Sequence, residues 1–133
     1  MPAVVVHDLA QAIQAARAAG AARARLTLRS APAAGRGLGV GGWLALADAA
    51  RAAVPTADVA FCLDCADDPG DAQAAIAAGA ERIALASDVP AHARIRALAD
   101  AVGATLDREP PALDLAFTRD PEAAVGRLLM SKP

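Results

Sequence analysis

One stretch of the chain, residues 57–87, constrains the fold more than any other. It reads A-D-V-A-F-C-L-D-C-A-D-D-P-G-D-A-Q-A-A-I-A-A-G-A-E-R-I-A-L-A-S, and near its start large apolar residues alternate with small or polar ones, as in a β-strand. Asp68 and Pro69 are residue types that begin a helix, and Gly79 is typical of a helix end. A second strand pattern opens at Ile83. A strand, a short helix and another strand in succession predict a parallel crossover.

The length and composition limit the classes of protein to which this chain can belong. With 133 residues, a single α/β domain spanning residues 1–133 is expected. A hydrophobic content of 56% with only 2% aromatic residues predicts closely packed, alanine-rich helices and leaves few rings to stack on nucleic acid bases. The net charge of −2 and the scattered arginines also argue against nucleic acid as a partner.

Membrane association and export are not expected either. The sequence has no apolar run that approaches the roughly 20 residues needed to span a bilayer. Its amino terminus, M-P-A-V-V-V-H-D, lacks the positive charge that begins a signal peptide, so the sequence predicts a cytoplasmic protein.

Strand and helix patterns alternate along the rest of the chain. Short apolar strands are predicted at residues 4–6 and 26–30, and helices at residues 8–20, 43–53 and 90–103. After residue 105 the pattern weakens: two prolines interrupt it, residues 113–117 form a candidate strand, and Asp120 and Pro121 begin a last helix. The alternation of strands and helices predicts an α/β fold.

Two segments of the chain are repeated. Residues 14–20, Q-A-A-R-A-A-G, match residues 73–79, Q-A-A-I-A-A-G, and residues 25–30, R-L-T-L-R-S, match residues 82–87, R-I-A-L-A-S. The nearly constant interval between the copies suggests a duplicated element of two strand–helix units. Chance similarity between alanine-rich helices is the alternative interpretation.

The segment A-A-I-A-A-G-A-E-R-I-A-L, residues 74–85, resembles the helix-to-strand turn that is common in TIM-barrel enzymes. The chain as a whole is similar in size to one half of a (βα)8 barrel. This resemblance implies a parallel (βα)4 half-barrel with an extra helix at the carboxyl terminus. It identifies no enzyme family, because no catalytic motif accompanies it.

A half-barrel of four strands has consequences for assembly. Its two open edges and its concave inner face have no cover within one chain, and open edges promote association. We therefore expect a homodimer or higher homo-oligomer, in which two copies close an eight-stranded barrel around a twofold axis. The alternative is a flavodoxin-like doubly wound sheet, which would use residues 113–117 as a fifth strand and need no partner.

In either fold, ligands bind at the carboxyl ends of the strands. In a half-barrel the large aliphatic side chains would face the helices, and the smaller or polar ones would face inward. Four polar side chains would then converge at one rim: His7, Arg29, Asp64 and Asp88. An arginine beside carboxylates is consistent with a ligand site of mixed charge. The alternative is an ion network that closes the top of the core.

A glycine-rich loop at residues 35–42 offers a second set of candidates for ligand binding. They are Arg36, Gly37, Gly39, Gly41 and Gly42, because glycines let backbone N–H groups approach an anion and a helix follows the loop. The loop contains G-x-G-x-x-G but does not follow the first strand, and it lacks the P-loop pattern. A tightly turned loop without a ligand is the alternative interpretation.

Cysteine, metal and lysine chemistry are not predicted. Cys62 and Cys65 have redox spacing, but the neighbouring aspartates oppose thiolate formation, so buried thiols are expected. The sequence lacks a second pair of metal ligands, and neither a metal nor another cofactor is predicted. Lys132 is its only lysine, which argues against a Schiff-base aldolase.

The sequence thus leaves three functional hypotheses and identifies no catalytic residue. The first is a self-associating half-barrel that binds a small anionic metabolite at the strand ends. The second is a lyase or isomerase that acts on a phosphorylated or carboxylated small molecule, with His7 or Asp64 moving a proton and Arg29 holding the anion. The third is a structural module without a small ligand.

Overall fold

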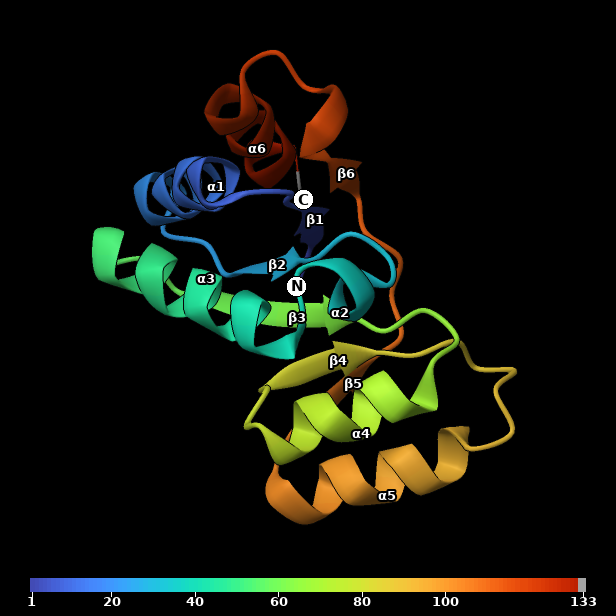
Figure 1. The fold of residues 1–133 in the computed structure, drawn as a ribbon. Helices are drawn as coiled ribbons and strands as arrows, with labels where there is room; N and C mark the ends of the chain where they lie inside the picture. The colour runs from blue at the N-terminus through green and yellow to red at the C-terminus, as the bar shows by residue number, and fades with distance from the viewer. Residues whose placement is uncertain (132–133) are drawn as a thin grey trace.

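The computed structural model describes residues 1–131, and over these residues it has one all-parallel sheet of six strands (Figure 1). The strand order across the sheet is β5-β4-β3-β2-β1-β6. The strands are β1 (Ala3–Val5), β2 (Leu26–Arg29), β3 (Val59–Asp64), β4 (Arg82–Ala84), β5 (Thr105–Asp107) and β6 (Leu113–Asp114). The predicted parallel α/β class is confirmed, and the sheet includes two strands beyond the four of the predicted half-barrel.

The longer helices form a single layer on one face of this sheet. The helices are α1 (Leu9–Ala22), α2 (Ala34–Gly37), α3 (Val40–Ala53), α4 (Pro69–Ala77), α5 (His92–Val102) and α6 (Pro121–Met130), with a 3-10 turn η1 (Leu115–Phe117). Neighbouring helices pack in the order α6-α1-α3-α4-α5, which follows the order of the strands (Figure 1). The flavodoxin-like alternative is therefore wrong, because a doubly wound sheet has helices on both faces.

Local sequence signals set most helix boundaries, as predicted. Asp8, Asp68 and Asp120 each accept a hydrogen bond from a first-turn amide, at 2.8, 3.1 and 3.2 Å respectively. Gly103 ends α5 in the left-handed conformation with φ 77°. The predicted end of α1 at Gly20 is wrong, because the helix continues to Ala22 before the chain turns.

The part of the chain after β4 differs most from the prediction. A strand forms at residues 105–107, where no strand was predicted, and the candidate strand at 113–117 is divided between β6 and η1. The two prolines at 110 and 111 exclude a helix between these strands, because proline cannot donate a backbone hydrogen bond. The strands β5 (T-L-D) and β6 (L-D) each contain a single large apolar residue, so no alternation marks them in the sequence.

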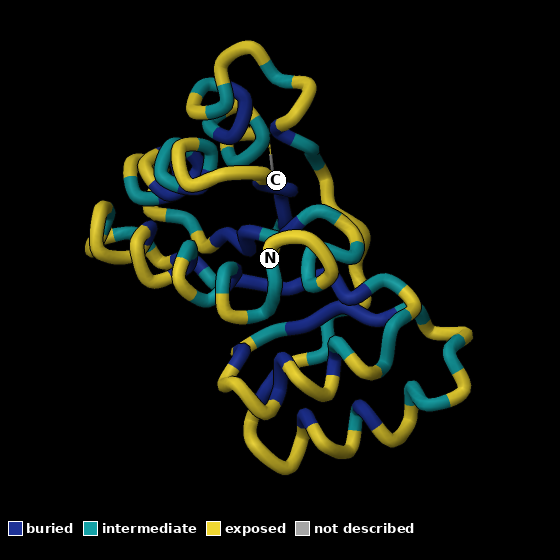
Figure 2. Tube along the Cα trace, in the orientation of Figure 1, coloured by how far each residue is buried: buried dark blue, intermediate teal, exposed yellow. Residues whose placement is uncertain are grey.

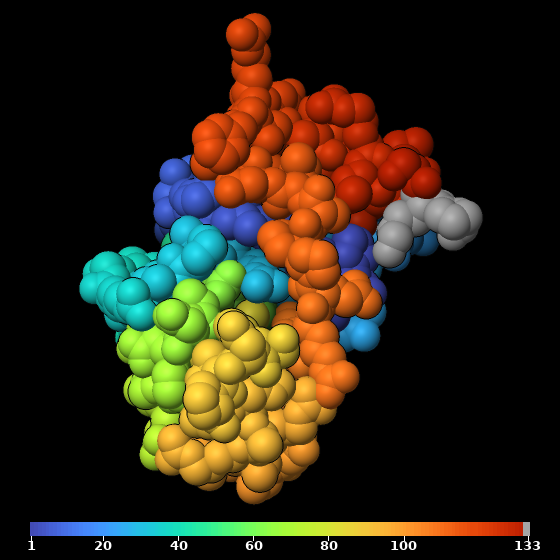
Figure 3. Space-filling view, turned by 90° about the vertical axis from the view of Figure 1, so that its right-hand side faces the viewer, coloured from blue at the N-terminus to red at the C-terminus, as the bar shows by residue number. Residues whose placement is uncertain are grey.

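Residues 108–112, here called the strap, join β5 to β6 across the face of the sheet that carries no helix. Figure 3 shows this segment in orange, running over the surface between the parts formed by α5 and α6. The strap and residues of β1, β2, β4 and β5 line one small pocket of about 240 Å³. The strap thus lies on the face that closure by a second copy would bury, and the predicted dimer stays a prediction.

The hydrophobic core lies between the sheet and the helix layer. Figure 2 shows buried backbone along the strands and along the helix sides that face them. Leu28, Phe61 and Leu63 point into this core, whereas Arg29 and Asp64 lie on the opposite face, as the alternation predicts. Trp43 is the largest fully buried side chain in the described residues. None of the helices described is both long and apolar enough for a membrane span.

Candidate functional site

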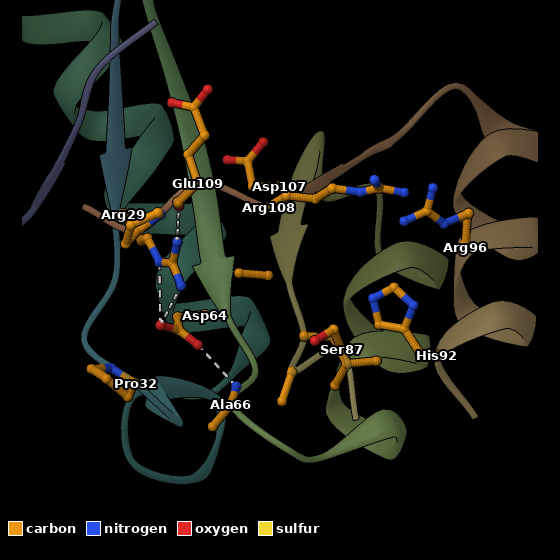
Figure 4. Close-up of a pocket in the computed structure, with 14 residues that line it drawn as sticks. Arg29, Pro32, Asp64, Ala66, Ser87, His92, Arg96, Asp107, Arg108 and Glu109 are labelled. Atoms are coloured by element: carbon orange, nitrogen blue, oxygen red, sulfur yellow. Dashed lines mark hydrogen bonds and ion pairs between the residues drawn. The ribbon is translucent and has the colours of Figure 1, made fainter. Parts of the chain in front are cut away.

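A pocket of about 860 Å³ opens at the carboxyl ends of β2, β3, β4 and β5 (Figure 4). The strands supply Arg29, Asp64 and Asp107, while α5 supplies His92 and Arg96. The loop after β4 and the strap complete its wall with Ser87, Arg108, Glu109 and Pro110. Parallel α/β folds bind their ligands at this end of the sheet, so this is the candidate site.

An ion pair between Arg29 and Asp64 forms one wall of the pocket. The Nη2 and Nε atoms of Arg29 lie 3.0 and 3.2 Å from Oδ2 of Asp64, and the two side chains are only 14% and 11% exposed. Asp64 also accepts a hydrogen bond from the Ala66 amide, and Arg29 donates a third one to the Glu109 carbonyl, each at 2.9 Å. Arg29 therefore connects β2, β3 and the strap, and its charge is balanced.

A second ion pair, between Arg82 and Asp107, joins β4 to β5 beside this wall. The Nε and Nη2 atoms of Arg82 lie 2.9 and 2.5 Å from Oδ1 of Asp107. These hydrogen bonds raise the pKa of Arg82 above its ordinary value. Asp107 lines the pocket, but its charge, like that of Asp64, is balanced by a neighbouring guanidinium.

The two cysteines are buried thiols, as the sequence predicted. Burial, the Asp107 carboxylate and the Asp64 carboxylate raise the pKa of Cys62 far above its ordinary value, although Arg29 acts against them. Burial and nearby aspartates raise the pKa of Cys65 to about 12. Neither thiol is a nucleophile at neutral pH. Within residues 1–131, the His, Cys, Asp and Glu side chains form no group of three or more that could hold a metal ion.

Four side chains form what we call the cationic corner of the pocket: Ser87, His92, Arg96 and Arg108. Figure 4 shows the guanidinium groups of Arg96 and Arg108 pointing toward one another, with the imidazole of His92 beneath them. Within the described part of the chain, neither guanidinium has an acidic partner within ion-pair distance. The cationic corner therefore has an excess of positive charge facing the pocket.

The sequence contained a signal for the cationic corner that the prediction missed. His92 and Arg96 are four residues apart in a helix, so they lie on the same side of α5. This helix begins just beyond the carboxyl end of β4, and Arg108 follows the end of β5 directly. Helical spacing would have grouped His92 with Arg96, but Arg108 could not be added, because β5 is not marked by alternation in the sequence.

The predicted rim is only partly assembled. Arg29 and Asp64 meet in the pocket, but Asp88 is exposed and does not line it. His7 lies at the end of β1 and lines a separate small pocket of about 180 Å³, where its Nε2 is 2.6 Å from Oδ1 of Asp114. Asp114 was not predicted as a partner because it lies in β6, whose position beside β1 follows from the strap.

The glycine-rich loop lies apart from the pocket. Arg36 pairs with Asp67 at 3.4 Å and with Asp68 at 3.6 Å, so its charge is partly balanced at the surface. The loop forms the short helix α2 and the start of α3, with Gly39 at φ 83° between them, a conformation that favours glycine. The other candidates in the loop also lie outside the pocket lining: Gly37, Gly41 and Gly42. Anion binding by this loop stays a prediction.

The contact between His7 and Asp114 makes the stability of the protein depend on pH. Partial burial acts to raise the pKa of Asp114, but hydrogen bonds from the Ala116 amide and from His7 outweigh it and hold the pKa below its ordinary value. A lowered carboxyl pKa contributes stability that is complete above the unfolded pKa of about 3.9 and is lost as the pH falls through the folded value.

Asp114→Asn tests this pH dependence. We expect the variant to be less stable than the parent protein near neutral pH, and the difference to shrink toward zero between about pH 4 and pH 2. Urea unfolding curves at several pH values measure it. A difference that stays constant down to pH 2 would show that the Asp114 carboxylate contributes nothing through its charge.

Comparison with known proteins supports the fold. No protein-family model matches the sequence, and no curated protein matches it. Among solved structures, a Coccidioides immitis protein assigned as a fructose-1,6-biphosphate aldolase is similar, with a TM-score of 0.60 and 22% sequence identity. The alignment covers 95% of this chain and 52% of that chain, so this chain spans about half the length of its structural neighbour.

This likeness concerns the fold alone, because the sequence identity is low. It agrees with the single layer of helices and with the sequential order of β1 to β5 described above. The chain has a parallel α/β fold with a structural neighbour of the TIM-barrel type.

Proposed function

We propose that this protein binds a small molecule carrying a phosphate or carboxylate group, and that the cationic corner holds this group. The observation that carries the proposal is the pair of guanidinium groups, Arg96 and Arg108, that face one pocket without an acidic partner in the described residues. Guanidinium groups present planar sets of donors that match phosphate and carboxylate oxygens.

The surroundings of the cationic corner favour an anion over a cation. The carboxylates of Asp64 and Asp107 are each neutralised by an arginine, so they cancel little of the charge on Arg96 and Arg108. Glu109 also lines the pocket, but its carboxylate points away from these two guanidinium groups (Figure 4). His92 is the first residue of α5, where the helix dipole adds partial positive charge to the same end of the pocket. Ser87 adds a hydroxyl donor.

Donors that approach from different directions favour a tetrahedral phosphate over a planar carboxylate. Arg96 comes from α5, Arg108 from the strap and Ser87 from the loop after β4. The name of the structural neighbour refers to a sugar that carries two phosphates, which agrees with this preference.

A lyase or isomerase acting on such a ligand is the second candidate. The observation that favours it is that Asp64 and Asp107 lie in the same pocket as the cationic corner, where a carboxylate can accept a proton from a bound ligand. Lys132, the only lysine, lies outside the described residues, and this candidate relies on carboxylate chemistry.

Calorimetric titration with inorganic phosphate, and with malonate as a carboxylate, tests the proposal. Binding should also stabilise the protein: at a concentration of about 100 times its Kd, a ligand that binds the folded state should raise the free energy of unfolding by about 2.7 kcal/mol. Arg96→Gln should weaken phosphate binding by about tenfold to a hundredfold, because a hydrogen bond to a charged group contributes about 1.5–3 kcal/mol.

Arg94→Gln is the matched control. Arg94 lies on the same helix and is exposed, but it does not line the pocket. It should leave the affinity for phosphate nearly unchanged. The proposal fails if neither anion binds, or if Arg94→Gln weakens binding as much as Arg96→Gln does.

A further inference from the structure

The strap is held on the sheet by few contacts. All five of its residues, 108–112, are exposed, and two of them are prolines, which have no backbone N–H to donate. In the described structure, its contacts with the sheet include a hydrogen bond from Arg29 to the Glu109 carbonyl, at 2.9 Å, and one from the Ala112 amide to the Ala3 carbonyl, at 2.7 Å. Segments with few buried apolar contacts open at low free-energy cost.

The strap also carries half of the charge of the cationic corner. Arg108 belongs to the strap and Arg96 to α5, and in Figure 4 the two guanidinium groups point toward one another. Like charges repel, so without an anion this pair opposes the position of the strap on the pocket. A phosphate between the two guanidinium groups would attract both of them, so the net interaction would then hold the strap on the pocket instead of opposing it.

We infer that the strap is a charge-controlled cover, which repulsion between Arg96 and Arg108 loosens and a bound anion fixes over the pocket. The inference rests on the proposed function for its second half, the action of the anion. It follows because a ligand shifts a conformational equilibrium when it binds one state more tightly than the other. Here the anion gains the Arg108 contact only when the strap is in place.

Trypsin reports the position of the strap because it cleaves after arginine, at the bond between Arg108 and Glu109. Cleavage after Arg119 is the internal control, since Arg119 is exposed and lines a different groove, between α1 and α6. In the ligand-free protein we expect Arg96→Gln to slow cleavage at Arg108 severalfold, with no change at Arg119. Sodium chloride should slow it in the parent protein too, because salt screens the repulsion.

Inorganic phosphate should then slow cleavage at Arg108 further in the parent protein but much less in Arg96→Gln. At about 100 times the Kd, the protection should reach tenfold or more, with an upper limit of about a hundredfold. Hydrogen exchange at the Ala112 amide is a second readout, because direct masking of the Arg108 side chain by phosphate would not change it. This amide should exchange about tenfold more slowly with phosphate.

The outcomes separate the inference from the proposed function. If calorimetry detects phosphate binding but exchange at Ala112 does not change, the inference is overturned and the proposed function stands. If phosphate does not bind but Arg96→Gln slows cleavage, the proposed function fails and charge control of the strap is supported. If Arg96→Gln and salt both leave the ligand-free cleavage rate unchanged, the inference is overturned whatever the binding result.

Discussion

Asp64→Ala is expected to lower the free energy of unfolding by about 3–5 kcal/mol, because it leaves the Arg29 guanidinium buried without its acidic partner. The side chain of Arg29 is only 14% exposed, so water can solvate the unpaired guanidinium only slightly. The Ala66 amide, in a left-handed turn with φ 52°, also loses its hydrogen-bond acceptor. Urea denaturation of the parent protein and the variant measures the loss.

Asp107→Ala is the comparison for this prediction. Its partner Arg82 is 24% exposed and can be solvated more easily, so we expect a smaller loss, of about 1–3 kcal/mol. The double variant Arg29→Leu/Asp64→Leu should recover most of the stability lost in Asp64→Ala, because replacing both members of a buried pair is often neutral. A loss below about 1 kcal/mol for Asp64→Ala would mean that the pair behaves as an exposed one.

This ion pair is also the part of the site that the sequence predicted best. Arg29 and Asp64 each end a strand, and the alternation of side chains along a strand places them on the face opposite Leu28 and Leu63. Parallel pairing of β2 with β3 then brings the two strand ends together. Strand position and side-chain alternation are local information, so the sequence contained what this part of the site required.

The unbalanced charge of the cationic corner could not be derived in the same way. Its character depends on which arginines lack an acidic partner, and partners such as Asp107 for Arg82 come from distant segments. His7 illustrates the same limit, because its partner Asp114 reaches it only after the strap has carried the chain from one edge of the sheet to the other. Side-chain pairings that depend on strand order cannot be predicted from hydrophobic periodicity or helix capping.

The same limit applies to the fold. Residues 57–87 fold as predicted into β3, α4 and β4, because the Asp68 cap, Pro69 and the apolar alternation act over a few residues. The strap has no such local signal except its prolines. They show where a helix is excluded, but they do not predict that the chain crosses the open face of the sheet. The prediction of four strands with two open edges therefore lacked the segment that crosses the open face.

Trp43→Ala is expected to lower the free energy of unfolding by about 3–5 kcal/mol, because it removes the largest buried side chain and leaves a cavity. Trp43 is 2% exposed and meets Phe61 edge to face, with ring centroids 5.9 Å apart and an angle of 67° between the planes. The same side of α3 buries mainly small side chains, Ala47 and Ala50, which cannot move far enough to fill the space. We therefore expect a loss toward the upper end of this range.

The Trp43 variant also separates stability from binding. Trp43 does not line the pocket that contains the cationic corner, so Trp43→Ala should leave the phosphate affinity of the folded protein within about twofold of the parent value. Trp43→Phe keeps a ring against Phe61 and should cost markedly less stability than the alanine variant. Urea denaturation and calorimetry at a temperature where both variants are folded measure the two effects. Trp43 and the pocket lie on opposite sides of the sheet and share only the strands between them. A large loss of phosphate affinity in Trp43→Ala would therefore mean that packing on the helix side of the sheet controls the pocket on the opposite side.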